Sequence, residues 1–340
     1  MVPLLELADP EVQVDIHLSD RRLFPIWDKV QAGDRLSGAE GVTLLDSDDI
    51  SGVGRMADFA KKRVTGDKVY FVLNRHVNPT NICVLSCKFC DFAKKPGDED
   101  AYEMTVEEIL DHVDDDIHEI HIVGGHHPTW PFEYYVEMIR AIHEKNPKLQ
   151  IKAFTASEVD YFQRRWKVTP EESLAILKEA GLQSMPGGGA EVFSPRVHKI
   201  LLPGKANGDR WADIHKIAHR MGIPTNCTLL YGHIETFEER VDHLIRLRNI
   251  QDETGGFTAF IPWSYKRDNT ALGKRVQKEA GPNAYLRMIA VSRIYLDNFQ
   301  HIQASWFSEG KKTGQVALHF GGVDFGGTLF DENVTQEAGF

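Results

Sequence analysis

This chain of 340 residues has few cysteines, no long apolar stretch and no excess of positive charge. Four cysteines are too few for a disulfide framework. No apolar run approaches the roughly 18 to 20 residues of a membrane-spanning helix. The net charge of −11 argues against nucleic acid bound through a general basic surface. The segment that begins at Met1 lacks the positive and apolar regions of a secretion signal. These absences predict a cytoplasmic protein without a membrane span or a nucleic-acid partner.

Strand-like and helix-like segments alternate from residue 68 onward. Eight short apolar segments are typical of buried strands, and amphipathic stretches separate most of them. This order predicts an α/β fold, and the strand count favours a (β/α)8 barrel of the TIM type over an open doubly wound sheet. The expected strands are 68–77, 119–125, 150–155, 182–186, 223–231, 257–263, 301–306 and 315–320. The expected helices are 105–113, 132–144, 170–180, 210–221, 236–252 and 283–298.

A helical region is expected before the first strand, from about residue 24 to residue 65. We expect Gly41 and Gly52 to break it, because glycine weakens the interior of a helix. The sequence therefore predicts an N-terminal helical extension at 1–65 and a barrel domain at 66–340.

Three of the four cysteines, Cys83, Cys87 and Cys90, form a C-x3-C-x2-C run directly after the first expected strand. Three thiolates from one loop can converge on one centre, but they are one ligand short of a closed structural site. A four-iron cubane held in this way keeps one iron open, which is typical of a catalytic centre. The alternative is a structural zinc in a binding protein without enzymatic activity, with His76 or His126 as the fourth ligand. The remaining cysteine is expected to be a buried, inert thiol.

The cysteine run, with the aromatic Phe89 inside it, resembles that of the radical S-adenosylmethionine (SAM) superfamily. The resemblance implies a barrel of the radical SAM kind, a [4Fe–4S] cluster on the three cysteines and SAM on the open iron. It also implies that Gly124 and Gly125 bind the methionine amino group through their backbone. Phe89 and Glu191 are further candidate contacts of the cofactor, Glu191 with its ribose.

Six longer segments resemble the aminofutalosine synthases of the futalosine route to menaquinone. They are NRHVNPTNIC (74–83), HIVGGHHP (121–128), KAFTA (152–156), PGGGAE (186–191), LYGHIET (230–236) and QDETGGF (251–257). The resemblance implies that the 5′-deoxyadenosyl radical adds to the enolpyruvyl double bond of 3-[(1-carboxyvinyl)oxy]benzoate. Rearrangement with loss of a carboxylate then gives 6-amino-6-deoxyfutalosine, and SAM is consumed. A flavodoxin or ferredoxin is the implied electron donor.

The C-terminal part of the chain looks closer to a sister family, the dehypoxanthine futalosine cyclases. The segments concerned are FIPWS (260–264), SRIYLDN (292–298), ASW (304–306) and DENV (331–334). Those enzymes use the same radical to abstract hydrogen from a ribose and close a ring. The synthase is favoured, because its segments span the second to fifth expected strands, and the cyclase is the alternative.

A benzoate substrate carries a carboxylate, so a cationic side chain is expected in its pocket. Arg75 and Arg293 are the candidates, and a structural ion pair is an equal alternative for each. His126 and Asp324 lie in loops after expected strands and are further candidates for substrate contact. No residue is assigned to proton transfer.

Overall fold

The computed structural model describes residues 16–267, 269–331 and 333. The chain forms two compact units and passes between them several times. Unit 1 comprises Met1–Phe71, Leu229–Ser264 and Glu279–Gly326, and unit 2 comprises Val72–Thr228, Tyr265–Lys278 and Gly327–Phe340. The division predicted at residue 65 stays a prediction. The segment examined for a secretion signal lies outside the described residues, as does part of the DENV segment.

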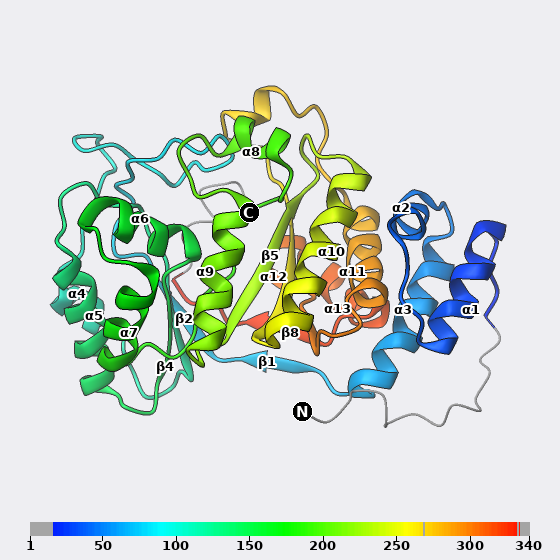
Figure 1. Ribbon diagram of the computed structural model, residues 1–340, viewed down its shortest axis with the longest axis horizontal. Coiled ribbons are helices and arrows are strands. Elements are labelled where there is room, and N and C mark those ends of the chain that lie inside the picture. The colour runs from blue at the N-terminus through cyan, green and yellow to red at the C-terminus, as the bar shows by residue number, and fades with distance from the viewer. Residues whose placement is uncertain (1–15, 268, 332, 334–340) are drawn as a thin grey trace. The chain divides into compact units, whose positions relative to one another are not determined.

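Unit 1 opens with three helices, drawn in blue in Figure 1: α1 (Phe24–Ala32), α2 (Gly38–Asp46) and α3 (Ile50–Thr65). Side chains satisfy the free main-chain groups at their ends. Ser37 and Glu40 form a capping box at the start of α2, and the Asp49 carboxylate caps α3. Gly33, with a φ of 78°, ends α1 in the left-handed conformation. The predicted helical region before the first strand is confirmed.

The prediction that Gly41 and Gly52 break this region is wrong, because both lie inside helices. A Cβ on Gly41 would lie 2.9 Å from the ring of Tyr295, and a Cβ on Gly52 would lie 2.5 Å from the Asp49 carboxylate. Close packing therefore explains why both residues are glycine. The chain turns between the helices, not at these two residues.

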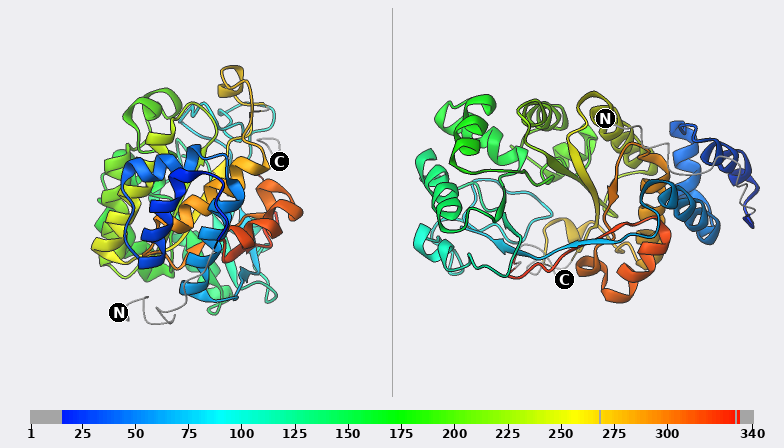
Figure 2. Two further views of the ribbon diagram at one scale, coloured as in Figure 1. Left: turned by 90° about the vertical axis from the view of Figure 1, so that its right-hand side faces the viewer. Right: turned by 90° about the horizontal axis from the view of Figure 1, so that it is seen from below.

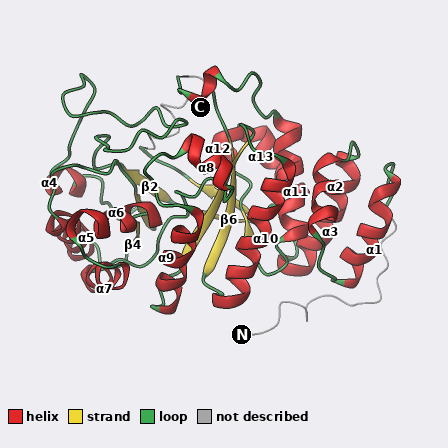
Figure 3. Cartoon of the chain, turned by 45° about the horizontal axis from the view of Figure 1, so that its top comes forward, coloured by secondary structure: helices red, strands yellow, loops and turns green. Residues whose placement is uncertain are grey.

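Several further elements belong to unit 1. It also contains the 3-10 helices η1 (Arg21–Leu23) and η3 (Leu318–Phe320), and the elements α10 (Phe237–Thr254), β6 (Phe257–Ser264), α11 (Pro282–Tyr295), β7 (His301–Ile302), α12 (Trp306–Glu309) and α13 (Lys311–Ala317). Strands β6 and β7 pair in parallel, with Ala259 opposite His301. Helix α3 packs against α11, and α2 packs against α10 (Figure 3).

The strand predicted at 315–320 is wrong. These residues form the end of α13 and the 3-10 helix after it, and the strand β8 (Asp324–Gly327) follows later. Gly314, Ala317 and Gly321 are buried, and their spacing of three and four residues is that of a helix. Val316 is 44% exposed, so the alternating apolar side chains do not share one buried face.

Unit 2 is built on a parallel sheet of β2 (Asn74–Val77), β3 (Glu119–Ile122) and β4 (Gln150–Ala153), in that order. Its helices are α4 (Val106–Leu110), α5 (Phe132–Lys145), α6 (Ala156–Trp166), α7 (Pro170–Ala180), α8 (Pro195–Leu201), α9 (Gly208–Arg220) and the 3-10 helix η2 (Leu272–Lys274). Helices α4 to α7 gather on one side of β2 and β4 (Figure 1), and the view from below shows them again outside the strands (Figure 2). The predicted alternation of strands and helices is confirmed here, with α6 and α8 as additions.

Three further strands run along the chain from one unit into the other: β1 (Tyr70–Val72), β5 (Thr225–Tyr231) and β8. The strand predicted at 182–186 is reduced to two single parallel bridges, Ser184 with Lys152 and Met185 with Thr225. None of the helices in the described part of the chain is long and apolar enough to cross a membrane.

The two faces of the β2–β3–β4 sheet differ in chemistry. On one face Ile120, Ile122, Ile151 and Ala153 are at most 1% exposed, and α5 packs against β4. The alternate positions on the opposite face are polar: Asn74 and His76 on β2, Glu119 and His121 on β3, and Gln150 and Lys152 on β4. A sheet covered by helices on both faces normally has apolar side chains on both. The polar face is therefore not expected to pack against a helix.

The close packing of Gly41 gives a test of the helical part of unit 1. We expect Gly41→Ala to lower the stability of the protein by about 1–3 kcal/mol, because the new methyl group overlaps Tyr295 and Val241. Gly38→Ala on the same helix is the control, since its Cβ would lie 3.7 Å from Ile245. The measurement is the thermal unfolding of the two variants beside the wild type. Equal melting temperatures for both variants would contradict the packing described here.

Candidate functional site

The segment that follows β2, at 78–95 and here named the cysteine loop, folds back on its own main chain. The N–H of Cys83 donates to the carbonyl oxygen of Lys94 at 3.0 Å, and the N–H of Lys94 donates to that of Asn81 at 2.8 Å. The Lys95 ammonium donates to the carbonyl oxygens of Cys83 and Leu85, at 2.8 and 2.7 Å. These bonds fix the course of the loop.

All three cysteines of the loop are free thiols, with Cys83 buried and the other two half-buried. Burial raises the pKa of Cys87, and it raises the pKa of Cys90 to about 11. The charges of the neighbouring cysteines add to both shifts, so the three sulfur atoms are close enough to interact. A metal centre that binds here must displace the thiol protons, as thiolate ligation always requires.

In the described part of the chain, no three Cys, His, Asp or Glu side chains gather closely enough to hold a single metal ion. The zinc alternative depends on such a group, and its candidate ligand His76 lies against the ring of His121 with centroids 4.4 Å apart. In a cubane cluster three cysteines bind three different iron atoms, so their sulfur atoms stand farther apart than the ligands of one ion. The donor set fits a cluster better than a single zinc ion.

The glycine pair after β3 packs directly against the cysteine loop. The N–H of Gly125 donates to the carbonyl oxygen of Thr80 at 2.8 Å. A Cβ on Gly125 would come within 2.1 Å of the Ile82 carbonyl oxygen, and one on Gly124 within 3.1 Å of that of Thr80. Both glycines are thus explained by close approach of two main chains. Their contact with the methionine amino group stays a prediction.

The carboxylate of Glu158 links the start of α6 to the same glycine pair. It accepts hydrogen bonds from the N–H and hydroxyl of Thr155, at 2.7 and 2.9 Å, in a capping box. The backbone of Gly124 also hydrogen-bonds to it. Burial raises the pKa of Glu158 to about 7 against these bonds. Glu158 therefore positions the glycine loop rather than standing free for a ligand.

A buried cation lies beside the cysteines. The Lys205 ammonium pairs with Glu191 at 3.3 Å and lies 5.6 Å from the centre of the Phe89 ring. Burial acts to lower the pKa of Lys205, but the charges of Glu191 and Cys87 outweigh it and hold the pKa above its ordinary value. Glu191 itself has a φ of 56°, which is uncommon for a residue with a side chain, and accepts the N–H of Gly189 at 3.2 Å.

His126 lies between the cysteine loop and α6. Its backbone N–H donates to the sulfur of Cys83 at 3.4 Å, and its ring lies against Tyr161 with centroids 4.9 Å apart. The Nε2 atom is 3.4 Å from the hydroxyl of Ser157, and the buried Nδ1 has no hydrogen-bond partner among the described residues. Burial lowers the pKa of His126 to about 3, so the ring is neutral. The structure thus brings His126 to the cysteines, together with Phe89 and the predicted residues at 124, 125 and 191.

The other predicted substrate residues have local partners. Arg75 pairs with Asp114 at 2.7 Å and with Asp331 at 3.1 Å, on the opposite face of β2 from His76. The guanidinium of Arg293 is buried and donates to main-chain carbonyls after α11, those of Leu296, Phe299 and Gln300. Burial lowers the pKa of Arg293 to about 10. The carboxylate of Asp324 accepts the N–H of Gly326 at 2.8 Å. Substrate contact by these three residues stays a prediction without added support.

Lys205 and Lys95 were not singled out from the sequence. Each lies near a turn, where a lysine is usually exposed to water. The shielding of Lys205, and the hydrogen bonds of the exposed Lys95 to the cysteine loop, depend on the folded course of the chain. The N–H of Lys88, for example, donates to the carbonyl oxygen of Leu201 at 2.9 Å and ties the cysteine loop to α8. No local pattern in the sequence reports that contact.

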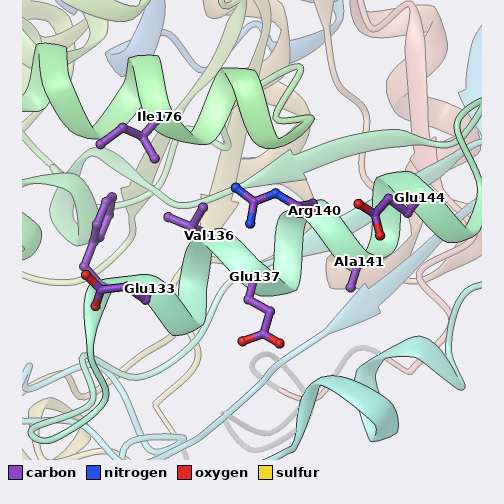
Figure 4. A pocket seen from close by; sticks show the side chains of 8 residues that line it. Glu133, Val136, Glu137, Arg140, Ala141, Glu144 and Ile176 are labelled. Atoms are coloured by element: carbon purple, nitrogen blue, oxygen red, sulfur yellow. The ribbon is translucent and has the colours of Figure 1, made fainter.

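A surface groove on the outer helices of unit 2 is separate from this site (Figure 4). Its lining comes from α5 and α7 alone: Phe132, Glu133, Val136, Glu137, Arg140, Ala141, Glu144 and Ile176. None of these residues belongs to the cysteine loop or to the segments that touch it. The groove is left out of the candidate site.

The class of protein follows from this loop and from two matches to family models. Residues 77–247, half of the chain, match the Radical SAM superfamily, and residues 254–340 match the CofH/MqnC C-terminal region. The chain belongs to the radical SAM superfamily. The resemblance first noted at the cysteines is thereby confirmed.

Solved structures of the superfamily have the same fold. Methylornithine synthase (PylB) superposes with a TM-score of 0.71 at 19% identity, over 91% of this chain and 87% of that chain. The hydrogenase maturase HydG from Carboxydothermus hydrogenoformans gives 0.70 at 17% identity, over 89% of this chain and 69% of that chain. The predicted α/β fold of the radical SAM kind is confirmed.

Individual relatives are much more similar in sequence. Aminodeoxyfutalosine synthase of Thermus thermophilus is 43% identical, over 95% of this chain and 88% of its own length. A 5-amino-6-(D-ribitylamino)uracil–L-tyrosine 4-hydroxyphenyl transferase of Methanopyrus kandleri is 42% identical, over 84% and 80%. Cyclic dehypoxanthine futalosine synthase of Streptomyces coelicolor is 39% identical, over 93% and 81%. The match to the first of these spans both family-model regions.

The packing of Gly125 predicts the behaviour of the cysteine loop. We expect Gly125→Ala to bind far less iron than the wild type, because the new methyl group pushes the main chain at Ile82 and displaces Cys83. The measurement is iron per chain after anaerobic reconstitution. Gly281→Ala is the control, since among the described residues only its own chain neighbours come within 4 Å of its Cβ position. Full iron content in Gly125→Ala would contradict the described packing.

Proposed function

We propose that the protein is a radical SAM aminodeoxyfutalosine synthase that carries a [4Fe–4S] cluster on Cys83, Cys87 and Cys90. The observation that carries the proposal is the identity of 43% with a synthase over 95% of the chain, together with the buried three-thiol loop. When bound, the cluster supplies the electron that cleaves SAM to a 5′-deoxyadenosyl radical, which adds to 3-[(1-carboxyvinyl)oxy]benzoate. The product is 6-amino-6-deoxyfutalosine, and a carboxylate is lost.

The residues of the chain hold and shield this chemistry. Lys95 fixes the main chain between the first two cysteines through two carbonyl oxygens. The ammonium of Lys205, buried beside Cys87, balances the negative charge that thiolate ligands bring. The N–H of His126 donates to the sulfur of Cys83, and such bonds tune the potential of iron–sulfur centres. Water exclusion around these groups protects a reactive radical.

A cyclase is the second candidate, and it has a specific basis. Cyclic dehypoxanthine futalosine synthase of Streptomyces coelicolor is 39% identical over 93% of the chain, only slightly less than the synthase from Thermus. The segments after residue 260 also look closer to that family. The synthase is proposed first because its similarity extends over the loops after β2, β3 and β4, which surround the cysteines. We also propose a flavodoxin or ferredoxin as electron donor and the cytoplasm as location.

The three families of relatives predict different products from one assay. Anaerobically reconstituted protein with dithionite and SAM is given 3-[(1-carboxyvinyl)oxy]benzoate, dehypoxanthine futalosine or L-tyrosine with 5-amino-6-(D-ribitylamino)uracil in separate reactions. We expect a covalent adduct of the adenosyl group in the first reaction alone, read by mass spectrometry. Cys87→Ala, which lacks a cluster ligand, is expected to give no product, and Cys227→Ala, altered at a separate buried thiol, is expected to remain active.

The same assay can contradict the proposal. A cyclised product from dehypoxanthine futalosine, with no adduct from the enolpyruvyl benzoate, would replace the synthase by the cyclase. One tightly bound zinc per chain and no iron after reconstitution would remove the radical mechanism altogether.

A further inference from the structure

Three polar side chains lie next to one another on the sheet of unit 2. The strand register sets His76 opposite His121, and His121 opposite Lys152. Each of them comes one residue before the end of its strand, so the polar row, as we name these three residues, lies just below the loops after the strands. These residues also belong to the three segments NRHVNPTNIC, HIVGGHHP and KAFTA.

His76, the first member of the polar row, lacks the hydrogen-bond partners that a buried polar group normally has. His76 is 8% exposed, and neither of its ring nitrogens has a hydrogen-bond partner in the described part of the chain. Its ring lies against His121, so the contact is between ring faces and leaves the nitrogen edges unused. Buried polar groups in folded proteins are nearly always hydrogen-bonded. An unpartnered imidazole at this depth therefore points to a missing ligand.

The row offers hydrogen-bond donors, and these suit an anion. Burial lowers the pKa of His76 and lowers that of His121 to about 3, and the nearby Lys152 acts in the same direction. Both imidazoles are therefore neutral, and each offers one N–H donor. The ammonium of Lys152 pairs with Glu119 at 2.5 Å, which uses one of its three N–H groups. Glu119 is held in turn by the amide of Asn74 at 3.4 Å.

We propose that the polar row binds the ring carboxylate of the benzoate substrate, with Lys152 and an imidazole N–H as donors. Glu119 acts as the positioning residue that holds the ammonium of Lys152 at the row. This inference rests on the proposed function, since it takes the substrate from there. A carboxylate held by a cation and a second donor is a strong, charge-assisted arrangement.

The depth of the polar row in the sheet indicates which of the two substrate carboxylates binds there. The enolpyruvyl carboxylate is attached to the reacting double bond, which must meet the adenosyl group near the cysteine loop. The ring carboxylate is on the benzene ring, meta to the ether oxygen, and is remote from that bond. The loop begins at Asn78, beyond the end of β2, whereas the row lies within the strands. The deeper position therefore suits the carboxylate that is remote from the reaction.

A binding measurement without turnover tests this assignment. The affinity of the oxidised holoenzyme with SAM, and without reductant, is measured by calorimetry for two probes. They are 3-[(1-carboxyvinyl)oxy]benzoate and 2-phenoxyacrylate, which lacks only the ring carboxylate. We expect the wild type to bind the first about 10- to 100-fold more tightly, as charged hydrogen bonds require.

The variant that tests the row is Glu119→Gln/Lys152→Met. It removes both members of the buried pair, so no lone buried charge is left to unfold the protein. We expect it to bind the two probes with equal affinity, while its affinity for 2-phenoxyacrylate, its iron content and its reductant-dependent cleavage of SAM without substrate stay unchanged. Lys148→Met, at an exposed lysine four residues away, is the matched control and keeps the full preference.

The possible failures can be told apart. If the double variant keeps the preference of the wild type for the benzoate, the row does not bind the ring carboxylate, and the proposed function stands. A lowered melting temperature with an unchanged preference would assign the row a purely structural role and overturn the inference. If the wild type shows no preference and forms no adduct in the product assay, the proposed function and the inference fall together.

Discussion

The main chain of Gly125 lies directly against the carbonyl group of Ile82, where a Cβ would come within 2.1 Å of the oxygen. Because the next residue along is Cys83, this contact fixes the main chain of the cysteine loop directly before its first cysteine. Hydrogen bonds from Lys95 and Lys94 hold the same stretch of main chain. Close contact of two main chains cannot be replaced by side-chain adjustment. The position of Cys83 therefore depends on the lack of a side chain at Gly125.

Unit 2 contains two largely buried lysine–glutamate pairs. A negatively charged group is proposed to bind beside each of them. Lys205 and Glu191 stand beside the cysteines, and Lys152 of the polar row pairs with Glu119. Removal of two charges from water costs about as much as their attraction returns, so such pairs add little to stability. Their value lies in holding a cation at a fixed point in a region of low polarity. The proposed thiolate-bound cluster and the proposed substrate with two carboxylates would each be balanced by such a cation.

The sequence predicts the parts of the structure that depend on local pattern. The alternation of strands and helices and the cysteine run all follow from periodicity and spacing. The apolar alternation at 315–320 misled the strand prediction, since burial at Gly314, Ala317 and Gly321 is set by tertiary packing. The partners of Lys205 and the register of the polar row join segments far apart in the chain. Such contacts leave no local signal, because one lysine or histidine in a sequence looks like any other.

The central claim is that the adenosyl group of SAM becomes part of the product through the centre held by the three cysteines. The most direct measurement uses SAM labelled with carbon-13 at the 5′ carbon of the ribose, with the reduced, reconstituted protein and the enolpyruvyl benzoate. The account predicts that the labelled carbon becomes bonded to a substrate carbon, with one SAM consumed for each product formed, as carbon-13 resonance would show. Label found only in the methyl group of free 5′-deoxyadenosine would contradict it.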